Sequence, residues 1–193
     1  MYFQKTLAAL ALTTLAACGG SSSGGGQFGA SPDALFNSLV DLQSLQGEWA
    51  IASDDSVNNA TGTANYTGFV NVGGGEELVG YLGQLAITAD FSGDTVSGSA
   101  GNFYEYGETT ITPGSTNPLG PAVAGSLSMS GTLTGTNQSA GIGGGIDGTF
   151  SGTVDGITES AGELSGMIMN ESRSGITLYF NGENLLGVGI GAR

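Results

Sequence analysis

The chain has 193 residues, 37 of them glycine, and a formal net charge of −14 that arises from 17 acidic and 3 basic residues. Such an acidic surface repels nucleic acid and anionic lipid headgroups, which excludes nucleic-acid binding as a function. The sequence contains no histidine, which excludes His-based triads, histidine metal sites and the commonest haem ligand.

The N-terminus reads as a bacterial lipoprotein signal. An apolar run from Leu7 to Ala17 follows the cation Lys5, and it is too short to span a bilayer but has the length of a secretory signal. Leu15-Ala16-Ala17-Cys18 resembles a lipobox, and Cys18 is the sole cysteine. The alternative is an ordinary signal peptide with a coincidental cysteine. We expect a signal peptide over 1–17, lipidation of Cys18 and a Gly/Ser tether over 18–30.

A single helix is predicted next. Ser31-Pro32-Asp33 is a helix start, with serine as N-cap and proline in the first turn. Apolar residues then recur at helical spacing. They are Leu35, Phe36, Leu39, Val40, Leu42 and Leu45. The pattern predicts an amphipathic helix over 32–45 that ends near Gly47, and no further helix is predicted after it.

The remaining chain alternates between apolar and polar residues, as strands with one buried face do. The predicted strands cover 61–72, 84–91, 95–104, 123–135, 142–155, 163–169 and 175–181, with further candidates at 185–190 and 47–52. Phe69 is an exception, because it lies on the polar face. Short strands that follow one another through turns predict an all-β fold, an antiparallel up-and-down β-barrel of about eight strands with one short N-terminal α-helix, in a single domain over 31–193.

Glycines alternate with large apolar residues in the predicted strand that contains Phe150. Ile146, Phe150 and Val154 share a face with Gly148 and Gly152. This pattern is typical of the inner face of a small barrel, which has no room for a second large side chain. The sequence leaves two placements of the predicted helix relative to the barrel open. A helix across the mouth or in the lumen leaves no solute cavity, whereas a helix outside leaves room for an apolar pocket.

Several short motifs resemble one family. Phe150-Ser151-Gly152 followed by Ala161-Gly162-Glu163-Leu164-Ser165-Gly166 is similar to a hairpin of the transferrin-binding protein B-like β-barrel domain. Tyr66-Thr67-Gly68-Phe69 resembles an early strand of that domain, and Leu85–Phe91 with Val96-Ser97-Gly98 resembles its two-strand unit. The resemblance covers most of 47–170 and implies a surface lipoprotein of Gram-negative bacteria with a binding role. Because the chain has one small barrel and lacks the receptor's paired lobes and handle domains, transferrin binding is not implied.

Catalytic and metal chemistry find little support in the residue types. The pairs Glu76-Glu77 and Asp54-Asp55 are adjacent in turn-like stretches, which is typical of solvated loop charges. Asp147 and Asp155 lie among glycines, but the calcium-binding nonapeptide pattern is not met. We therefore expect no enzymatic activity, no cofactor and no metal site.

Two segments are candidates for contact with a partner. The region 104–121 is the least strand-like, and long loops in compact domains are often functional. Tyrosine there offers amphipathic contact area at low entropic cost. The candidate residues are Tyr104, Glu105, Tyr106 and Glu108, followed by Glu76, Glu77 and Tyr81 in the 73–82 segment. The alternative is a tolerated surface insertion.

Two functional hypotheses follow. The first is a lipoprotein anchored in the outer membrane through Cys18, on its periplasmic face or at the cell surface, with a non-enzymatic barrel that captures a small solute or a partner protein. The second is a structural envelope lipoprotein with no dedicated ligand. A membrane-spanning barrel is disfavoured, because the outward faces are rich in Ser, Thr, Asn and Asp. A secreted fibre subunit is a remote further option.

Overall fold

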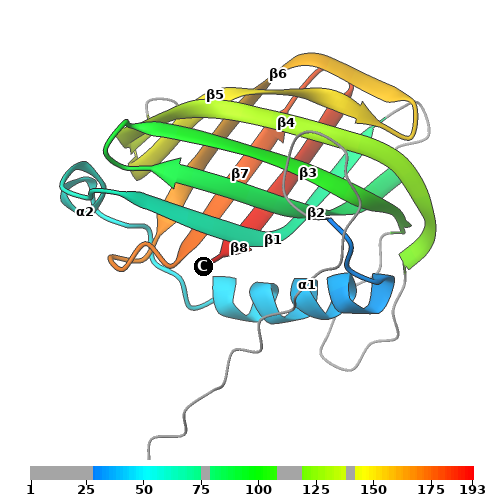
Figure 1. Ribbon diagram of the computed structural model, residues 1–193, viewed down its shortest axis with the longest axis horizontal. Helices are drawn as coiled ribbons and strands as arrows, with labels where there is room; N and C mark the ends of the chain where they lie inside the picture. The colour runs from blue at the N-terminus through cyan, green and yellow to red at the C-terminus, as the bar shows by residue number, and fades with distance from the viewer. Residues whose placement is uncertain (1–27, 75–78, 108–118, 138–141) are drawn as a thin grey trace, which may run out of the picture.

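The computed structural model describes residues 28–74, 79–107, 119–137 and 142–193. Among them are two helices and eight strands (Figure 1). The elements are α1 (Pro32–Gln46), α2 (Asp54–Asn58), β1 (Thr63–Gly74), β2 (Val79–Asp90), β3 (Thr95–Tyr106), β4 (Leu119–Asn137), β5 (Ile142–Val154), β6 (Ile157–Met169), β7 (Gly175–Asn181) and β8 (Leu185–Ala192). The predicted signal peptide, Cys18 and most of the predicted tether lie outside the described residues.

The eight strands form a closed barrel in which each strand pairs with its neighbour in the sequence. All pairs are antiparallel, and β1 closes the barrel against β8 from Thr67↔Ala192 to Gly74↔Leu185. Closure pairs the two strands that would otherwise be sheet edges. The predicted all-β, up-and-down barrel with a short N-terminal helix is therefore confirmed.

The helix α1 lies outside the barrel, where it packs across β1 and β8 (Figure 1). Its start matches the sequence pattern, because the Ser31 hydroxyl accepts a hydrogen bond from the Ala34 N–H at 3.3 Å. Leu35 and Leu39 are almost fully buried against the barrel wall. Of the two positions left open by the sequence, the structure has the exterior one.

The docking of α1 explains why Phe69 breaks the alternation of β1. Phe69 points outward, but it is only 2% exposed because α1 covers it. Leu82, Tyr104 and Ile190 are outward residues of β2, β3 and β8 that lie in the same cluster. The barrel thus has two apolar layers, one inside the lumen and one between the wall and α1.

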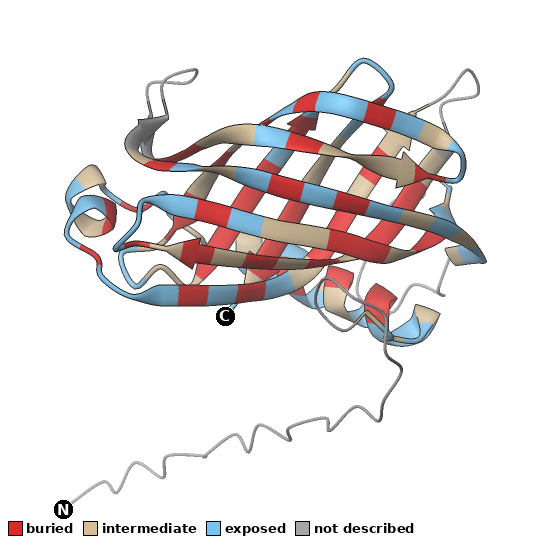
Figure 2. Cartoon of the chain, turned by 45° about the horizontal axis from the view of Figure 1, so that its top comes forward, coloured by how far each residue is buried: buried red, intermediate tan, exposed pale blue. Residues whose placement is uncertain are grey.

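Among the described residues, large apolar side chains pack together inside the lumen. Figure 2 shows buried and exposed residues alternating along the strands, as expected when one face points inward. Tyr66, Phe103 and Phe150 are among the largest fully buried side chains, and Phe150 packs edge-on against Phe180 with ring centroids 5.1 Å apart. A Cβ added at inward-facing Gly162 would overlap the Phe150 ring. The inner-face interpretation of the glycines is therefore consistent with the packing.

A short helix that the sequence analysis missed closes one end of the barrel. In α2, the Ser53 hydroxyl accepts from the Ser56 N–H at 3.2 Å, and Val57 packs into the lumen cluster. Glu171 on the β6–β7 connection accepts hydrogen bonds from the Ser53 N–H and hydroxyl, both at 3.0 Å. These hydrogen bonds hold the pKa of Glu171 below its usual value, and the bond from the Ser53 N–H has the largest effect.

The predicted strand limits differ from the observed ones in several places. The strand β2, predicted from Gln84, begins at Val79, so Tyr81 lies within a strand, and β6, predicted from Glu163, begins at Ile157. Residues 47–52 contain only an isolated bridge, between Ile51 and Met169. The strand β3 extends to Tyr106 and β4 begins at Leu119, so the predicted irregular region 104–121 is shorter than expected. The strand β6 begins directly after a two-residue turn at Asp155 and Gly156, whose φ values of 50° and 80° match the turn that tight hairpins favour.

Candidate functional site

The two ends of the barrel differ in chemistry. In an up-and-down barrel the β1–β2, β3–β4, β5–β6 and β7–β8 connections share one end, and α2 closes the other. We call the first end the mouth and define it by Tyr81, Glu105, Gly120, Asp155 and Glu159. The mouth contains two of the residues that the sequence analysis selected.

Tyr81 and Glu105 lie opposite each other on β2 and β3. The Tyr81 side chain points inward and is 3% exposed, and its hydroxyl donates a hydrogen bond to Asp155 Oδ2 at 3.0 Å. Glu105 is exposed. The structure thus joins Tyr81 to Asp155, a residue that was not selected as a candidate contact, and places Glu105 opposite Tyr81.

Tyr104 and Tyr106 occupy the other face of β3. Tyr104 is buried beneath the start of α1, and its hydroxyl donates to the Ala30 carbonyl at 3.5 Å. Tyr106 packs against the same cluster, and burial raises its pKa. Both tyrosines therefore stabilise the docking of α1 rather than facing the mouth. The remaining predicted residues, Glu76, Glu77 and Glu108, lie outside the described residues.

Glu159 is a buried carboxylate at the mouth that the sequence analysis did not select. It is 4% exposed, and its oxygens accept from the backbone N–H groups of Asn184 at 2.9 Å, Ser160 at 3.1 Å and Ala161 at 3.4 Å. The bond from Asn184 is the largest cause of a lowered pKa at Glu159. The side chain ties the bulge of β6 to the β7–β8 turn. No local sequence signal indicated it, because alternation counted back from Leu164 places position 159 on the polar face, and the register shift between Glu159 and Gly162 turns the side chain inward.

The cations lie at the opposite end. The sequence after Lys5 has only Arg173 and Arg193. Arg173 Nη1 donates to the Ser56 carbonyl of α2 at 2.9 Å, and the Arg193 guanidinium donates to the Ser172 carbonyl at 2.7 Å. The mouth therefore combines carboxylates with no arginine or lysine among its described residues, which favours a positively charged contact.

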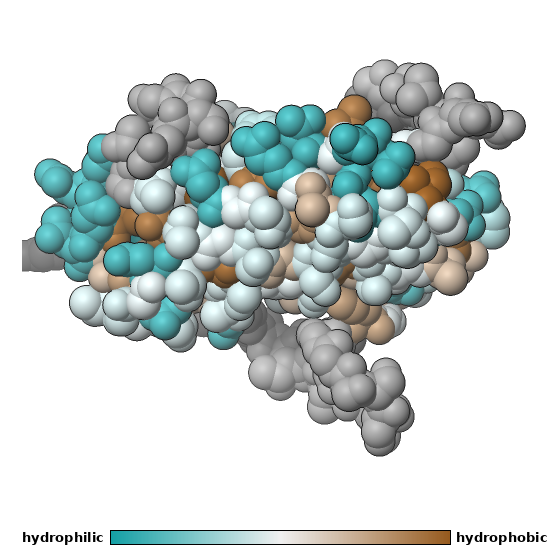
Figure 3. Space-filling view, turned by 90° about the horizontal axis from the view of Figure 1, so that it is seen from above, coloured by the Kyte–Doolittle hydropathy of each residue, from teal (hydrophilic) through white to brown (hydrophobic). Residues whose placement is uncertain are grey.

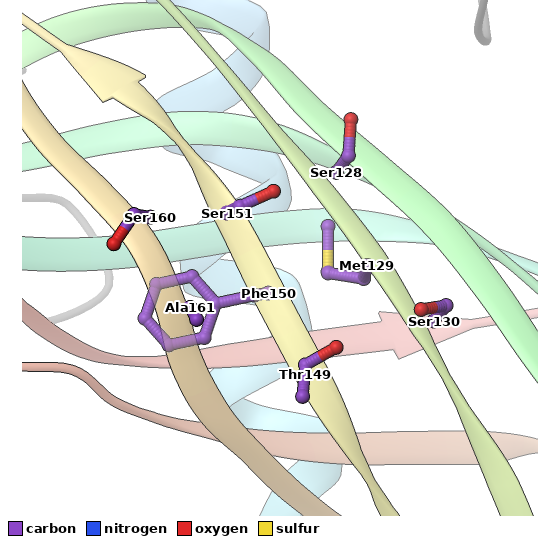
Figure 4. Close-up of a pocket in the computed structure, with 8 residues that line it drawn as sticks. All are labelled: Ser128, Met129, Ser130, Thr149, Phe150, Ser151, Ser160 and Ala161. Carbon is purple, nitrogen blue, oxygen red and sulfur yellow. The ribbon is translucent and has the colours of Figure 1, made fainter.

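A shallow depression of about 230 Å³ lies on the outer wall over β4, β5 and β6 (Figure 4). Its lining is mostly hydroxyl-bearing and comprises Ser128, Met129, Ser130, Thr149, Phe150, Ser151, Ser160 and Ala161. Figure 3 shows a surface of mostly intermediate hydropathy on this side of the molecule, with hydrophilic patches and smaller hydrophobic areas between them. The depression has no ionisable lining residue, so it offers hydrogen bonds to a neutral polar group but no acid, base or charged nucleophile.

Within the described parts of the chain, no cluster of three or more His, Cys, Asp or Glu side chains is arranged to hold a metal ion. None of the helices in those parts has the length and apolar character needed to cross a membrane. No protein-family model matches the chain, and no curated protein or solved structure matches it either.

Proposed function

We propose that this protein is an outer-membrane lipoprotein, anchored through Cys18, whose barrel binds a partner protein at the mouth without catalysing a reaction. The observation that carries the proposal is the filled lumen. Aromatic rings of Tyr66, Phe103 and Phe150 occupy the space that a carried solute would need. The packing therefore disfavours the other version of the binding hypothesis, in which a small solute binds inside the barrel. A partner would instead bind to the outer surface.

The attachment of the N-terminal segment supports a tethered arrangement. The Gln84 amide oxygen on β2 accepts from the N–H groups of Gly29 at 2.7 Å and Ala30 at 3.0 Å, and Asn102 Nδ2 donates to the Ala30 carbonyl at 2.8 Å. The chain thus enters the folded domain at a fixed point on the barrel wall. A lipid on Cys18 would hold the barrel near the membrane while leaving the mouth accessible.

Metabolic labelling with an alkyne-bearing fatty acid tests the anchor. The native chain should incorporate the label and partition with the outer membrane, and Cys18→Ser should do neither. Labelling of the Cys18→Ser variant to the native level would refute lipidation at this residue.

Site-specific photocrosslinking in the native cell tests the binding role. A benzophenone amino acid at Gly107 samples the mouth, because Gly107 directly follows β3, is exposed, and has room for a side chain. The same group at exposed Ser97 on the wall of β3 is the matched control. We expect a discrete protein adduct from position 107 and none from position 97. Adducts from neither position would favour the structural lipoprotein.

Native mass spectrometry on residues 27–193, incubated with extract of the host cell, distinguishes a solute carrier. We expect the bare chain mass, because the lumen is filled. A reproducible small added mass that disappears on denaturation would overturn exterior binding as the main function.

A further inference from the structure

The strand β4 extends past its neighbour β5 at the mouth. Pairing of β4 with β5 begins at Gly125↔Val154, because the chain turns at Asp155 and Gly156. On its other side β4 continues to pair with β3, through Phe103↔Val123 and Tyr104↔Ala122. The residues from Gly120 to Val123 thus have β3 on one side and, within the described parts of the chain, no strand on the other. Figure 1 shows this end of β4 curving beyond the β5–β6 turn.

The backbone of this segment presents hydrogen-bonding groups on its open side. The Ala124 carbonyl faces away from β3, because it accepts from the Asp155 N–H at 2.8 Å. The register of β4 against β3 shifts on both sides of this stretch, between Leu119 and Ala122 and between Val123 and Ser126. Alternate residues of an extended strand direct their N–H and C=O groups to the same side, so the groups of Ala122, two residues before Ala124, also face the open side. Gly120, Pro121 and Ala122 are exposed. Pro121 has no N–H, and the Ala124 carbonyl is already bonded to Asp155. The N–H and C=O groups of Ala122 are therefore the ones that an added strand can pair with.

Two carboxylates flank the open edge. At one end, a Cβ added at Gly120 would lie 3.0 Å from the Glu105 Cβ and 3.4 Å from its Oε2, so the Glu105 side chain lies over Gly120. At the other end, Asp155 hydrogen-bonds to Ala124 and carries a side chain that reaches Tyr81. Both arginines of the folded domain are bound at the opposite end. A segment that pairs with this edge therefore meets negative charge at both ends.

We propose that the edge from Gly120 to Ala124 is a strand-addition site for an extended segment of a partner protein that carries lysine or arginine near its ends. The inference rests on the proposed function and specifies how the partner binds. Backbone hydrogen bonds to Ala122 hold the added segment in place, and Glu105 and Asp155 select the charge. A second copy of this chain does not match the site. Its own β4 edge is flanked by the same two carboxylates, and its two arginines lie at the opposite end of the barrel.

Fluorescence anisotropy with a labelled Lys-Val-Thr-Val-Thr-Val-Lys heptapeptide tests the site, using residues 18–193 with Cys18→Ser. The matched peptide has glutamate in place of both lysines. We expect the lysine peptide to bind and the glutamate peptide to bind at least about tenfold more weakly. Affinity for the lysine peptide should fall as salt is raised.

Backbone pairing is tested at Ala122. Ala122→Pro removes the N–H group on the open side and should weaken binding of the lysine peptide about tenfold. Ala122→Ser keeps the N–H and should bind like the native chain. Because proline at position 122 can disturb the hairpin, far-UV circular dichroism and the unfolding midpoint of both variants are measured alongside.

Charge selection is tested independently of the backbone. Glu105→Gln and Asp155→Asn keep the shape of each side chain, and asparagine still accepts from the Tyr81 hydroxyl and tolerates the positive φ of 50°. Each variant should bind the lysine peptide several-fold more weakly and with less salt dependence. Equal binding of the two peptides, or native affinity in folded Ala122→Pro, overturns the inference. If the position-107 crosslink persists in that case, the proposed function stands and only the strand-addition mode fails.

Discussion

The contact between Gly162 and Phe150 gives a direct test of how the lumen is packed. Phe150 is 1% exposed, and the three atoms nearest to a Cβ built at Gly162 all belong to its ring. Gly162 has no positive φ, so alanine there is strained by the ring and not by the backbone. We predict that Gly162→Ala changes the sign of its effect on stability when Phe150 is also truncated.

The magnitudes follow from the packing. In the native background, overpacking costs about 1–3 kcal/mol, while alanine in place of glycine in a strand gains about 0.5–1 kcal/mol. Gly162→Ala should therefore destabilise the barrel by about 0.5–2 kcal/mol. Phe150→Ala alone should cost about 3–5 kcal/mol, because the vacated space is bordered by glycine and cannot easily be refilled. With the ring gone, Gly162→Ala should instead stabilise by about 1.5 kcal/mol, from the strand gain and one buried methyl group.

Urea unfolding of the four proteins measures this cycle, followed by far-UV circular dichroism and by the fluorescence of Trp49, the sole tryptophan. The indole packs on Gly175 outside the barrel, so its signal reports unfolding without contacting the mutated pair. We expect a coupling free energy of about 2–3 kcal/mol between the two positions. An equal effect of Gly162→Ala in both backgrounds, with coupling below about 0.5 kcal/mol, would refute the inferred contact.

Three further predictions concern the ends of the barrel and α1. Hydrogen bonds lower the pKa of Glu159, so its contribution to stability is present above the unfolded pKa of 4.5 and is lost as the pH falls through the folded pKa. In urea titrations at several pH values, Glu159→Gln should therefore lose less stability on acidification than the native chain. An unchanged pH profile would contradict the assignment. Burial raises the pKa of Tyr66 to about 12 from 10.0, so stability should be intact below pH 10 and decline as the pH rises towards 12. Tyr66→Phe should weaken that alkaline decline and cost about 0.5–1.5 kcal/mol at pH 7, since its hydroxyl donates to the Arg173 carbonyl; an alkaline unfolding curve identical to the native one would argue against it. Leu39 lies on the barrel-facing side of α1 and is 2% exposed, so Leu39→Ala should cost about 2–5 kcal/mol. Leu45, also in α1, is 45% exposed, so Leu45→Ala should change stability by less than about 0.5 kcal/mol. Equal effects in a thermal melt would mean that α1 is not docked as described.

Local rules were enough to predict α1 and most strands. The helix start at Ser31 and Pro32 is specified by capping chemistry within one turn, and β7 was predicted with its observed limits because alternation in 175–181 is uninterrupted. The helix α2 was missed because five residues are too few for a helical period to be recognised. Its first turn is held by hydrogen bonds from Ser53 and Ser56 to Glu171, which is remote in sequence.

The candidate site was only partly accessible from sequence. Tyr81 and Glu105 were selected for their residue type, and the structure pairs them across β2 and β3. Tyr104 was selected on the same grounds, yet it faces α1, because neighbouring strand residues point to opposite faces. The partnership of Asp155 with Tyr81 joins residues that are 74 apart in the sequence, so no local pattern indicated it.

The sequence by itself determined the all-β barrel, its inner face and the helix that precedes it, because alternation, glycine spacing and capping are encoded between near neighbours. The tertiary structure decided that the helix packs outside and that aromatic rings pack inside the lumen. It also decided that β4 extends beyond the end of β5 at an acidic mouth. Those features depend on strand register and on the shape of the closed barrel. Register and closure are set by contacts between distant segments, which a single sequence pattern does not specify.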